Sequence, residues 1–176
     1  DNPVVAGCVQ NQDSYMQSVA AQRPYFFEHI RDLTDTCMAE YAGLTGRQYK
    51  RVMGYRVEDA EYIILGMGSL MGTAEAVVDY LRATRGLKVG VVNMTMYRPF
   101  PSDLVGEILK GRKGVVVRER TDQPLAEDLP LIREIRATVS KCLENGMAGG
   151  TGSQRYPHHA MYAKLSDAPV LYSGCF

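Results

Sequence analysis

Short apolar runs alternate with helix-spaced segments through the middle of the chain. Residues 62–66, 89–92 and 114–117 are almost uniformly apolar, whereas residues 73–85 and 102–110 carry apolar side chains at helical spacing. Strands that are apolar on both faces and joined by helices are typical of a parallel sheet covered by helices. The pattern therefore predicts an α/β fold whose functional loops follow the carboxyl ends of the strands.

An earlier segment predicts a helix that precedes this unit. Pro24 suits its first turn, and Gly46 suits the position just past its end. Apolar residues recur there every three or four positions as one stripe: Phe26, Ile30, Leu33, Cys37, Tyr41 and Leu44. Residues 1–23 are polar and mixed and are predicted to form an arm or linker, and residues 51–55 predict a short strand.

The other helices are also expected to bury one stripe each. In the helix after the first apolar run, the stripe is Leu70, Ala74, Val77 and Leu81. Ser102 is expected to cap the next helix. The last helix is predicted to begin near Pro130 and to stop at Gly146, with the stripe Ile132, Ile135, Val139 and Cys142. Residues 146–168 lose this periodicity and predict a long excursion before a final strand at 170–172.

These elements predict a three-layer α/β sandwich with a mostly parallel central sheet and an N-terminal helical arm. We expect the arm or linker at residues 1–23 and a single α/β domain at residues 24–176. The sequence begins without Met and stops within an apolar segment, so we expect a fragment of a longer chain.

Composition and charge narrow the classes of function. The 176 residues include 20 basic and 20 acidic side chains, so no net charge recruits nucleic acid or an anionic membrane. No apolar run is long enough to span a bilayer, and the start does not resemble a signal peptide. The four cysteines are scattered without a CxxC pair, which favours reduced, buried thiols in a cytoplasmic protein.

Glycines cluster where the first apolar run turns into a helix. Residues 66–72 have the spacing GxGxxxG, which is one residue longer than the dinucleotide-binding fingerprint. The next strand also ends without the acidic residue that would hold a ribose. We interpret Gly66 and Gly68 as residues of a tight turn that lets the helix approach the sheet. A weaker alternative stays open, in which the N–H groups beside Ser69 accept an anion.

Arginines stand at the ends of the other two central strands. Tyr97 and Arg98 precede two prolines that stiffen the chain. Arg98 is expected either to bind an acidic group, across an interface rather than on a substrate, or to pair within the domain. Arg118 and Arg120 follow the next strand and could add to an anion-attracting rim, although a solvated, mutually paired cluster is the alternative.

No other motif predicts a catalytic or metal site. His158 and His159 lack acidic or cysteine neighbours at metal-ligand spacing, and His29 lies within a predicted helix. Residues 149–152 lack the lysine of a phosphate-binding loop. We therefore predict no catalytic residue and no metal ligand in this chain.

Three segments taken together resemble a known family. They are residues 7–17 (GCVQNQDSYMQ), residues 44–50 (LTGRQYK), and the central stretch from Met67-Gly68-Ser69 to Tyr97-Arg98-Pro99-Phe100-Pro101. In this order they resemble the pyruvate:ferredoxin (flavodoxin) oxidoreductases. The similarity is to the second domain of the single-chain enzymes, which is shaped like the C-terminal domain of transketolases. It covers most of residues 2–145 and resumes at residues 169–176.

The resemblance implies a parent enzyme that decarboxylates pyruvate or another 2-oxoacid on thiamine diphosphate and Mg²⁺. Such an enzyme releases acyl-CoA and CO₂, and passes electrons through iron–sulfur clusters to ferredoxin or flavodoxin. The cofactors are expected in other domains. For this domain the resemblance implies a structural and interface role beside other domains or subunits, within an enzyme expected to be a homo-oligomer.

Two other interpretations stay open. One is the C-terminal domain of a transketolase or of a 2-oxoacid dehydrogenase. The other is a stand-alone module that binds a nucleotide or CoA at residues 66–72. The loop at residues 121–128 differs from the longer acidic loop of single-chain pyruvate enzymes, which leaves the choice of 2-oxoacid open.

Overall fold

The structure is a computed structural model that describes residues 9–147 and 162–175. The chain divides into two compact units, Asp1–Gln48 and Tyr49–Phe176. In the described ranges, no helix is both long enough and apolar enough to cross a membrane.

The first unit consists of one long helix, α1 (Gln12–Thr45). It ends as predicted at Gly46, which takes the left-handed conformation with φ 73° and donates its N–H to the carbonyl of Ala42. The predicted start at Pro24 is wrong, because Pro24 lies inside the helix. Residues 12–23 carry apolar residues at helical spacing, Tyr15, Met16 and Val19, but these stand among polar residues and were interpreted as part of an arm. The domain boundary expected between residues 23 and 24 falls within α1.

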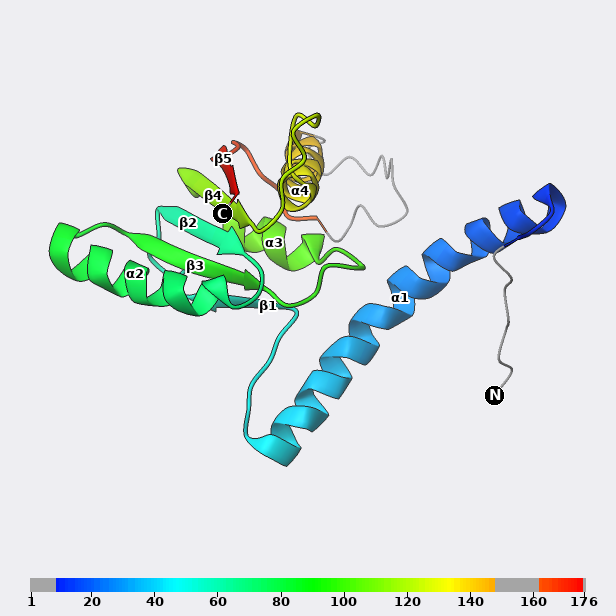
Figure 1. Cartoon of the computed structure of the whole chain (residues 1–176), viewed down its shortest axis with the longest axis horizontal. Helices are drawn as coiled ribbons and strands as arrows, with labels where there is room; N and C mark the ends of the chain where they lie inside the picture. Colours follow the sequence, from blue (N-terminus) through cyan, green and yellow to red (C-terminus); the bar gives the residue numbers. More distant parts are fainter. Residues whose placement is uncertain (1–8, 148–161, 176) are drawn as a thin grey trace. The chain divides into compact units, whose positions relative to one another are not determined.

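The second unit contains a five-stranded sheet (Figure 1). Its strands are β1 (Val52–Tyr55), β2 (Tyr62–Gly66), β3 (Val89–Met94), β4 (Gly114–Glu119) and β5 (Val170–Cys175). The spatial order is β1-β3-β2-β4-β5, and only β1 among these strands runs antiparallel to its neighbour. The mostly parallel sheet predicted from the apolar runs is confirmed.

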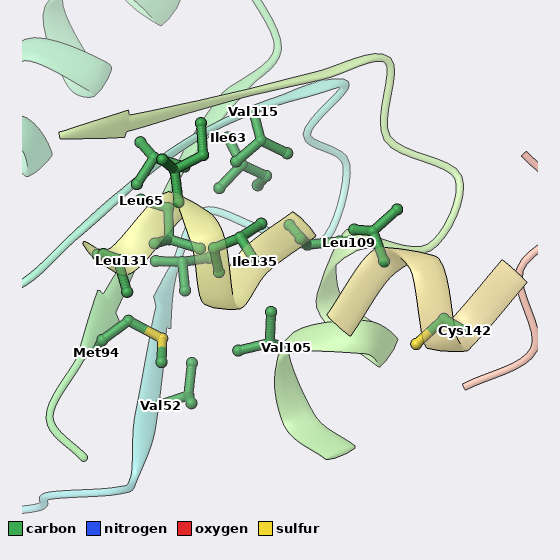
Figure 2. Close-up of a cluster of buried hydrophobic side chains, with 14 of the residues drawn as sticks. Val52, Ile63, Leu65, Met94, Val105, Leu109, Val115, Leu131, Ile135 and Cys142 are labelled. Atoms are coloured by element: carbon green, nitrogen blue, oxygen red, sulfur yellow. The ribbon is translucent and has the colours of Figure 1, made fainter. Parts of the chain in front are cut away.

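Helices cover both faces of this sheet. The helix α2 (Leu70–Arg85) packs on one face against β3, while α3 (Ser102–Leu109) and α4 (Pro130–Met147) pack on the other (Figure 1). The three-layer α/β architecture is therefore confirmed, together with the helix at the N-terminal side of the chain. In Figure 2, Ile63, Leu65 and Val115 from the sheet gather against Leu109 of α3 and Ile135 of α4.

The helical stripes were predicted with unequal success. All four predicted residues of α4 are buried, whereas α2 buries Met71, Ala74 and Val78 rather than the full predicted stripe. These three residues pack against Val89 and Val91 of β3, and the edge of α2 toward β1 carries Asp79, which accepts hydrogen bonds from Tyr55 and Arg56. The prediction from apolar spacing alone did not include these polar anchors.

Two boundary residues have other roles than predicted. Ser102 lies within α3 after the cap residue Pro101, and its hydroxyl accepts a buried hydrogen bond from Thr138 of α4 at 3.1 Å. Gly146 does not stop α4, which continues to Met147. A Cβ at Gly146 would lie 1.9 Å from the carbonyl oxygen of Leu165, so the glycine permits a close chain crossing.

Candidate functional site

The carboxyl ends of the parallel strands meet at one edge of the sheet. From this edge the chain passes from β2 through α2 to β3, which lies on one side of the β2–β4 pair. It passes from β4 through α4 to β5, which lies on the other side of that pair. Such a reversal is where open α/β sheets usually bind their ligands. The predicted site residues lie at these strand ends: Gly66, Gly68 and Ser69 at the end of β2, Tyr97 and Arg98 after β3, and Arg118 and Arg120 around the end of β4.

The turn between β2 and α2 requires its glycines. A Cβ at Gly66 would lie 2.8 Å from the sulfur of Met71 and 3.0 Å from the carbonyl oxygen of Arg118. Gly68 has φ +80°, a conformation that other residues rarely adopt. Ser69 begins α2 without a side-chain hydrogen bond to the helix. The geometry agrees with a tight turn that brings the helix close to the sheet, and anion binding there stays a prediction.

Arg98 is held by its own domain and still reaches solvent. One guanidinium nitrogen donates to Glu134 of α4 at 2.8 Å, and another donates to the carbonyl of Tyr97 at 3.0 Å. The guanidinium carbon lies 4.1 Å from the centre of the Tyr97 ring, a cation–π contact. The side chain of Arg98 nevertheless remains 58% exposed. The pairing within the domain thus positions Arg98 without burying it.

Glu119 is the residue whose role the sequence analysis missed. It is only 7% exposed, and its two carboxylate oxygens accept the backbone N–H groups of Leu131 at 2.6 Å and Ile132 at 3.0 Å. These are among the N–H groups that the first turn of a helix leaves without an internal partner. A carboxylate also complements the partial positive charge at the start of α4. The end of β4 is thereby fixed to the start of the following helix.

One signal in the sequence could have revealed Glu119. The carbonyl of Leu129 accepts the first helical bond, from Arg133, so the apolar Leu129 is the cap residue of α4. Such a residue cannot satisfy the free N–H groups, which therefore need an acceptor from elsewhere. Asp128, the polar residue next to Leu129, instead pairs with Arg136 at 2.5 Å.

The arginines do not form one rim. Glu119 points toward α4, so its neighbour Arg118 points to the opposite face of the sheet. There the Arg118 guanidinium lies over Gly174 of β5, since a Cβ at Gly174 would be 2.5 Å from it. Arg98 lies on the α4 face, so Arg98 and Arg118 are on different faces. Arg120 is exposed beyond the strand end.

The remaining candidate residues divide between described and undescribed segments. His158, His159 and residues 149–152 lie outside the described residues. His29 lies in α1, where its ring Nδ1 is 2.8 Å from the carbonyl oxygen of Tyr25. Within residues 9–147 and 162–175, no group of three His, Cys, Asp or Glu side chains could hold a metal ion. Burial raises the pKa of the Cys142 thiol to about 11, because the thiolate would lose its solvation.

A family model decides the relationship of this chain. The model described as pyruvate:ferredoxin oxidoreductase core domain II matches residues 60–160, more than half of the chain. This chain belongs to that family. The matched region includes the turn after β2, the Tyr97–Arg98 segment and the Glu119 contact with α4, so the whole candidate site lies within the family's core domain II.

Curated relatives agree with the family and are much longer than this chain. A probable pyruvate-flavodoxin oxidoreductase of Escherichia coli is 37% identical over 147 residues, which are 83% of this chain and 12% of that protein. A pyruvate synthase subunit PorA of Thermotoga maritima is 34% identical over 85% of this chain and 37% of its own length. A pyruvate:ferredoxin oxidoreductase of Moorella thermoacetica is 31% identical over 89% of this chain and 14% of its own.

A solved structure of a related enzyme is more distant. It is a 2-oxoglutarate:ferredoxin oxidoreductase from Magnetococcus marinus, with a TM-score of 0.46 and 23% identity over 77% of this chain and 18% of that one. The predicted family is confirmed by the family model and the curated relatives.

Proposed function

We propose that this chain is the core domain II of a 2-oxoacid:ferredoxin or flavodoxin oxidoreductase. The complete enzyme converts a 2-oxoacid, with pyruvate the first candidate, and CoA into acyl-CoA and CO₂. The two electrons released pass one at a time to ferredoxin or flavodoxin. The observation that carries this proposal is the core domain II match over residues 60–160, together with relatives that are named for pyruvate oxidoreductases.

Within that enzyme we propose an interface role for this domain. This proposal is supported by a polar side chain that is both oriented and exposed at the strand ends. Arg98 is oriented by Glu134 and Tyr97 yet stays largely exposed, a combination that suits contact with an acidic group of a neighbouring domain. We propose that the other predicted residues contribute to contacts at this edge of the sheet, on either face: Gly66, Gly68, Ser69, Tyr97, Arg118 and Arg120.

We propose that the cofactors of the enzyme are held by its other domains. Thiamine diphosphate with Mg²⁺, iron–sulfur clusters and CoA are the groups implied for the complete enzyme. In support, the described cysteines Cys37, Cys142 and Cys175 are far apart in the sequence and lack the close spacing of cluster ligands. We propose other domains or subunits of the same enzyme as the direct partners, and a homo-oligomer in the cytoplasm as the complete assembly.

Activity of the complete gene product tests the proposal. The assay follows CoA-dependent reduction of ferredoxin and flavodoxin with pyruvate and, separately, with 2-oxoglutarate. We expect turnover with at least one of these 2-oxoacids and none from the 176-residue chain alone. Absence of turnover with every 2-oxoacid would contradict the assignment, and decarboxylation by the chain alone would contradict the interface role.

A further inference from the structure

On the face that carries α2, apolar side chains of β2, β4 and β5 are exposed, and this apolar surface ends at Arg118, whose guanidinium lies over Gly174 of β5. Residues paired between parallel strands point to the same face, and the side chains of β2, β4 and β5 alternate between the two faces. We use the name open face for four residues on the α2 side: Tyr62 (45% exposed), Val116 (37%), Val170 (55%) and Tyr172 (54%). Contiguous exposed apolar side chains on a sheet mark a surface for association.

The helix α2 lies beside the open face rather than over it. Asp79 faces β1, where it accepts hydrogen bonds from Tyr55 and Arg56 at 2.7 Å each. Successive residues turn by about 100° around a helix, so the side chains on the opposite flank of α2 face β4. That flank consists of Leu70, Val77 and Leu81, and Val77 is 43% exposed. The apolar surface therefore continues from the sheet onto the helix.

We propose that the open face docks an amphipathic helix from a part of the complete enzyme outside these 176 residues. This inference rests on the proposed function. The docked helix lies beside α2, over β4 and β5, with an apolar stripe turned to the sheet. It contacts the rings of Tyr62 and Tyr172 and the side chain of Val116 below, and the Val77 flank of α2 at its side.

The dimensions of the sheet favour a helix. Neighbouring strands are about 4.8 Å apart, so β4 and β5 together provide a width of about one helix diameter. Packed helices lie about 8–10 Å apart, which places a second helix next to α2 above this pair of strands. The leucine and valine flank of α2 offers that helix an apolar neighbour.

The sequence of β4 also indicates a covered face. Val115 and Val117 are fully buried beneath α3 and α4, and Val116 between them is equally apolar but points to the open face. Parallel strands of this kind occur almost always in sheets that are covered on both sides. Tyr62 and Tyr172 combine an apolar ring with a hydroxyl, a property that makes tyrosine common in interfaces.

The lengths of the relatives indicate where the covering helix comes from. The matched regions are 12% of the Escherichia coli relative and 37% of the Thermotoga maritima subunit. In proteins of that size most of the polypeptide lies outside the region that this chain matches. The covering helix therefore comes from a segment outside that region.

Photo-cross-linking in the complete enzyme tests this proposal. A benzophenone amino acid replaces Tyr172, and mass spectrometry identifies the cross-linked peptide after irradiation. We expect a cross-link to a helical segment outside residues 1–176. The same probe at Leu125, which is 102% exposed and lies on the loop after β4, serves as the control and should not capture that segment. A cross-link to any residue of 1–176, in the same chain or in a second copy, overturns the proposal, as does no cross-link from Tyr172.

A second variant guards against a probe that disturbs folding. A benzophenone amino acid at Val77 should cross-link to the same helical segment as the probe at Tyr172. Val116→Asp places a charge on the open face, so we expect this variant to lose the Val77 cross-link. Circular dichroism should show that the variant enzyme is still folded. An undiminished cross-link overturns the proposal. Activity separates the two proposals: turnover with a 2-oxoacid but no helix captured removes only this inference, whereas no turnover removes the proposed function.

Discussion

The two faces of the sheet differ in how completely this domain covers them. On the α3 and α4 face, Ile63, Leu65 and Ile135 have no exposed surface, and the core is closed. On the α2 face, Val78 and Val91 are equally buried, but the surface over β4 and β5 is open at Val116 and Tyr172. One face thus holds the domain together, and the other leaves part of its apolar surface for association.

The largest effect is expected from the closed face. Ile135→Ala removes a fully buried side chain and leaves a cavity, so we expect the free energy of unfolding to fall by about 2–5 kcal/mol. Val77→Ala on the exposed flank of α2 is the comparison, with an expected loss under about 1 kcal/mol. Denaturant unfolding of the 176-residue chain measures both. Equal losses would show that the two faces do not differ as described.

The contact between β4 and α4 should give the next effect. Glu119→Ala leaves two buried N–H groups without their acceptor, at a cost of about 1–3 kcal/mol. Glu127→Ala, at an exposed position of the preceding loop, is the matched control and should change stability by less than about 0.5 kcal/mol. A Glu119 variant as stable as its control would show that the contact of Glu119 with α4 does not stabilise the chain.

The ion pair at Arg98 should contribute little to stability. Because Arg98 is 58% exposed, Arg98→Ala should cost the chain about 0–1 kcal/mol. If Arg98 contacts a neighbouring domain, the same variant should weaken the complete enzyme more than it weakens the chain. Thermal unfolding of both proteins provides the measurement, and equal shifts would argue against an interface role for Arg98.

The cysteine thiols should have the smallest effect on stability, and this effect should depend on pH. Cys142 should resist alkylation near neutral pH while the exposed Cys37 and Cys175 react. The raised pKa of Cys142 stabilises the fold fully below its ordinary value of 9.0, and this contribution is lost as the pH rises toward about 11. Unfolding measured at both ends of this range should show a steeper loss for the native chain than for Cys142→Ala. Parallel losses would contradict the raised pKa.

The spacing of apolar residues in the sequence was sufficient to predict most of the strands and helices. The apolar runs gave β2, β3 and β4, and the stripe of α4 gave its buried face, because burial alone decides those positions. The start of α1 and the rotation of α2 were mispredicted. The first part of α1 has only a short apolar signal among polar residues, at Tyr15, Met16 and Val19. The spacing in α2 fits two neighbouring stripes, and the sheet buries the one with Met71, Ala74 and Val78.

The site was harder to predict than the scaffold. The sequence located the strand ends and Arg98, but the cap by Glu119 depends on a contact between β4 and the later residues Leu131 and Ile132. The opposite orientations of Arg98 and Arg118 likewise depend on strand alternation and on what each face packs against. Such relations arise from tertiary structure and have no local pattern.

Hydrogen–deuterium exchange tests the contrast between the two faces most directly, because it compares the chain alone with the complete enzyme. We expect slower exchange for peptides of β4 and β5 in the complete enzyme, where a docked helix covers the open face. Peptides of α3 and α4 should exchange alike in both proteins. Equal exchange of β4 and β5 in the two proteins would contradict an association role for the open face.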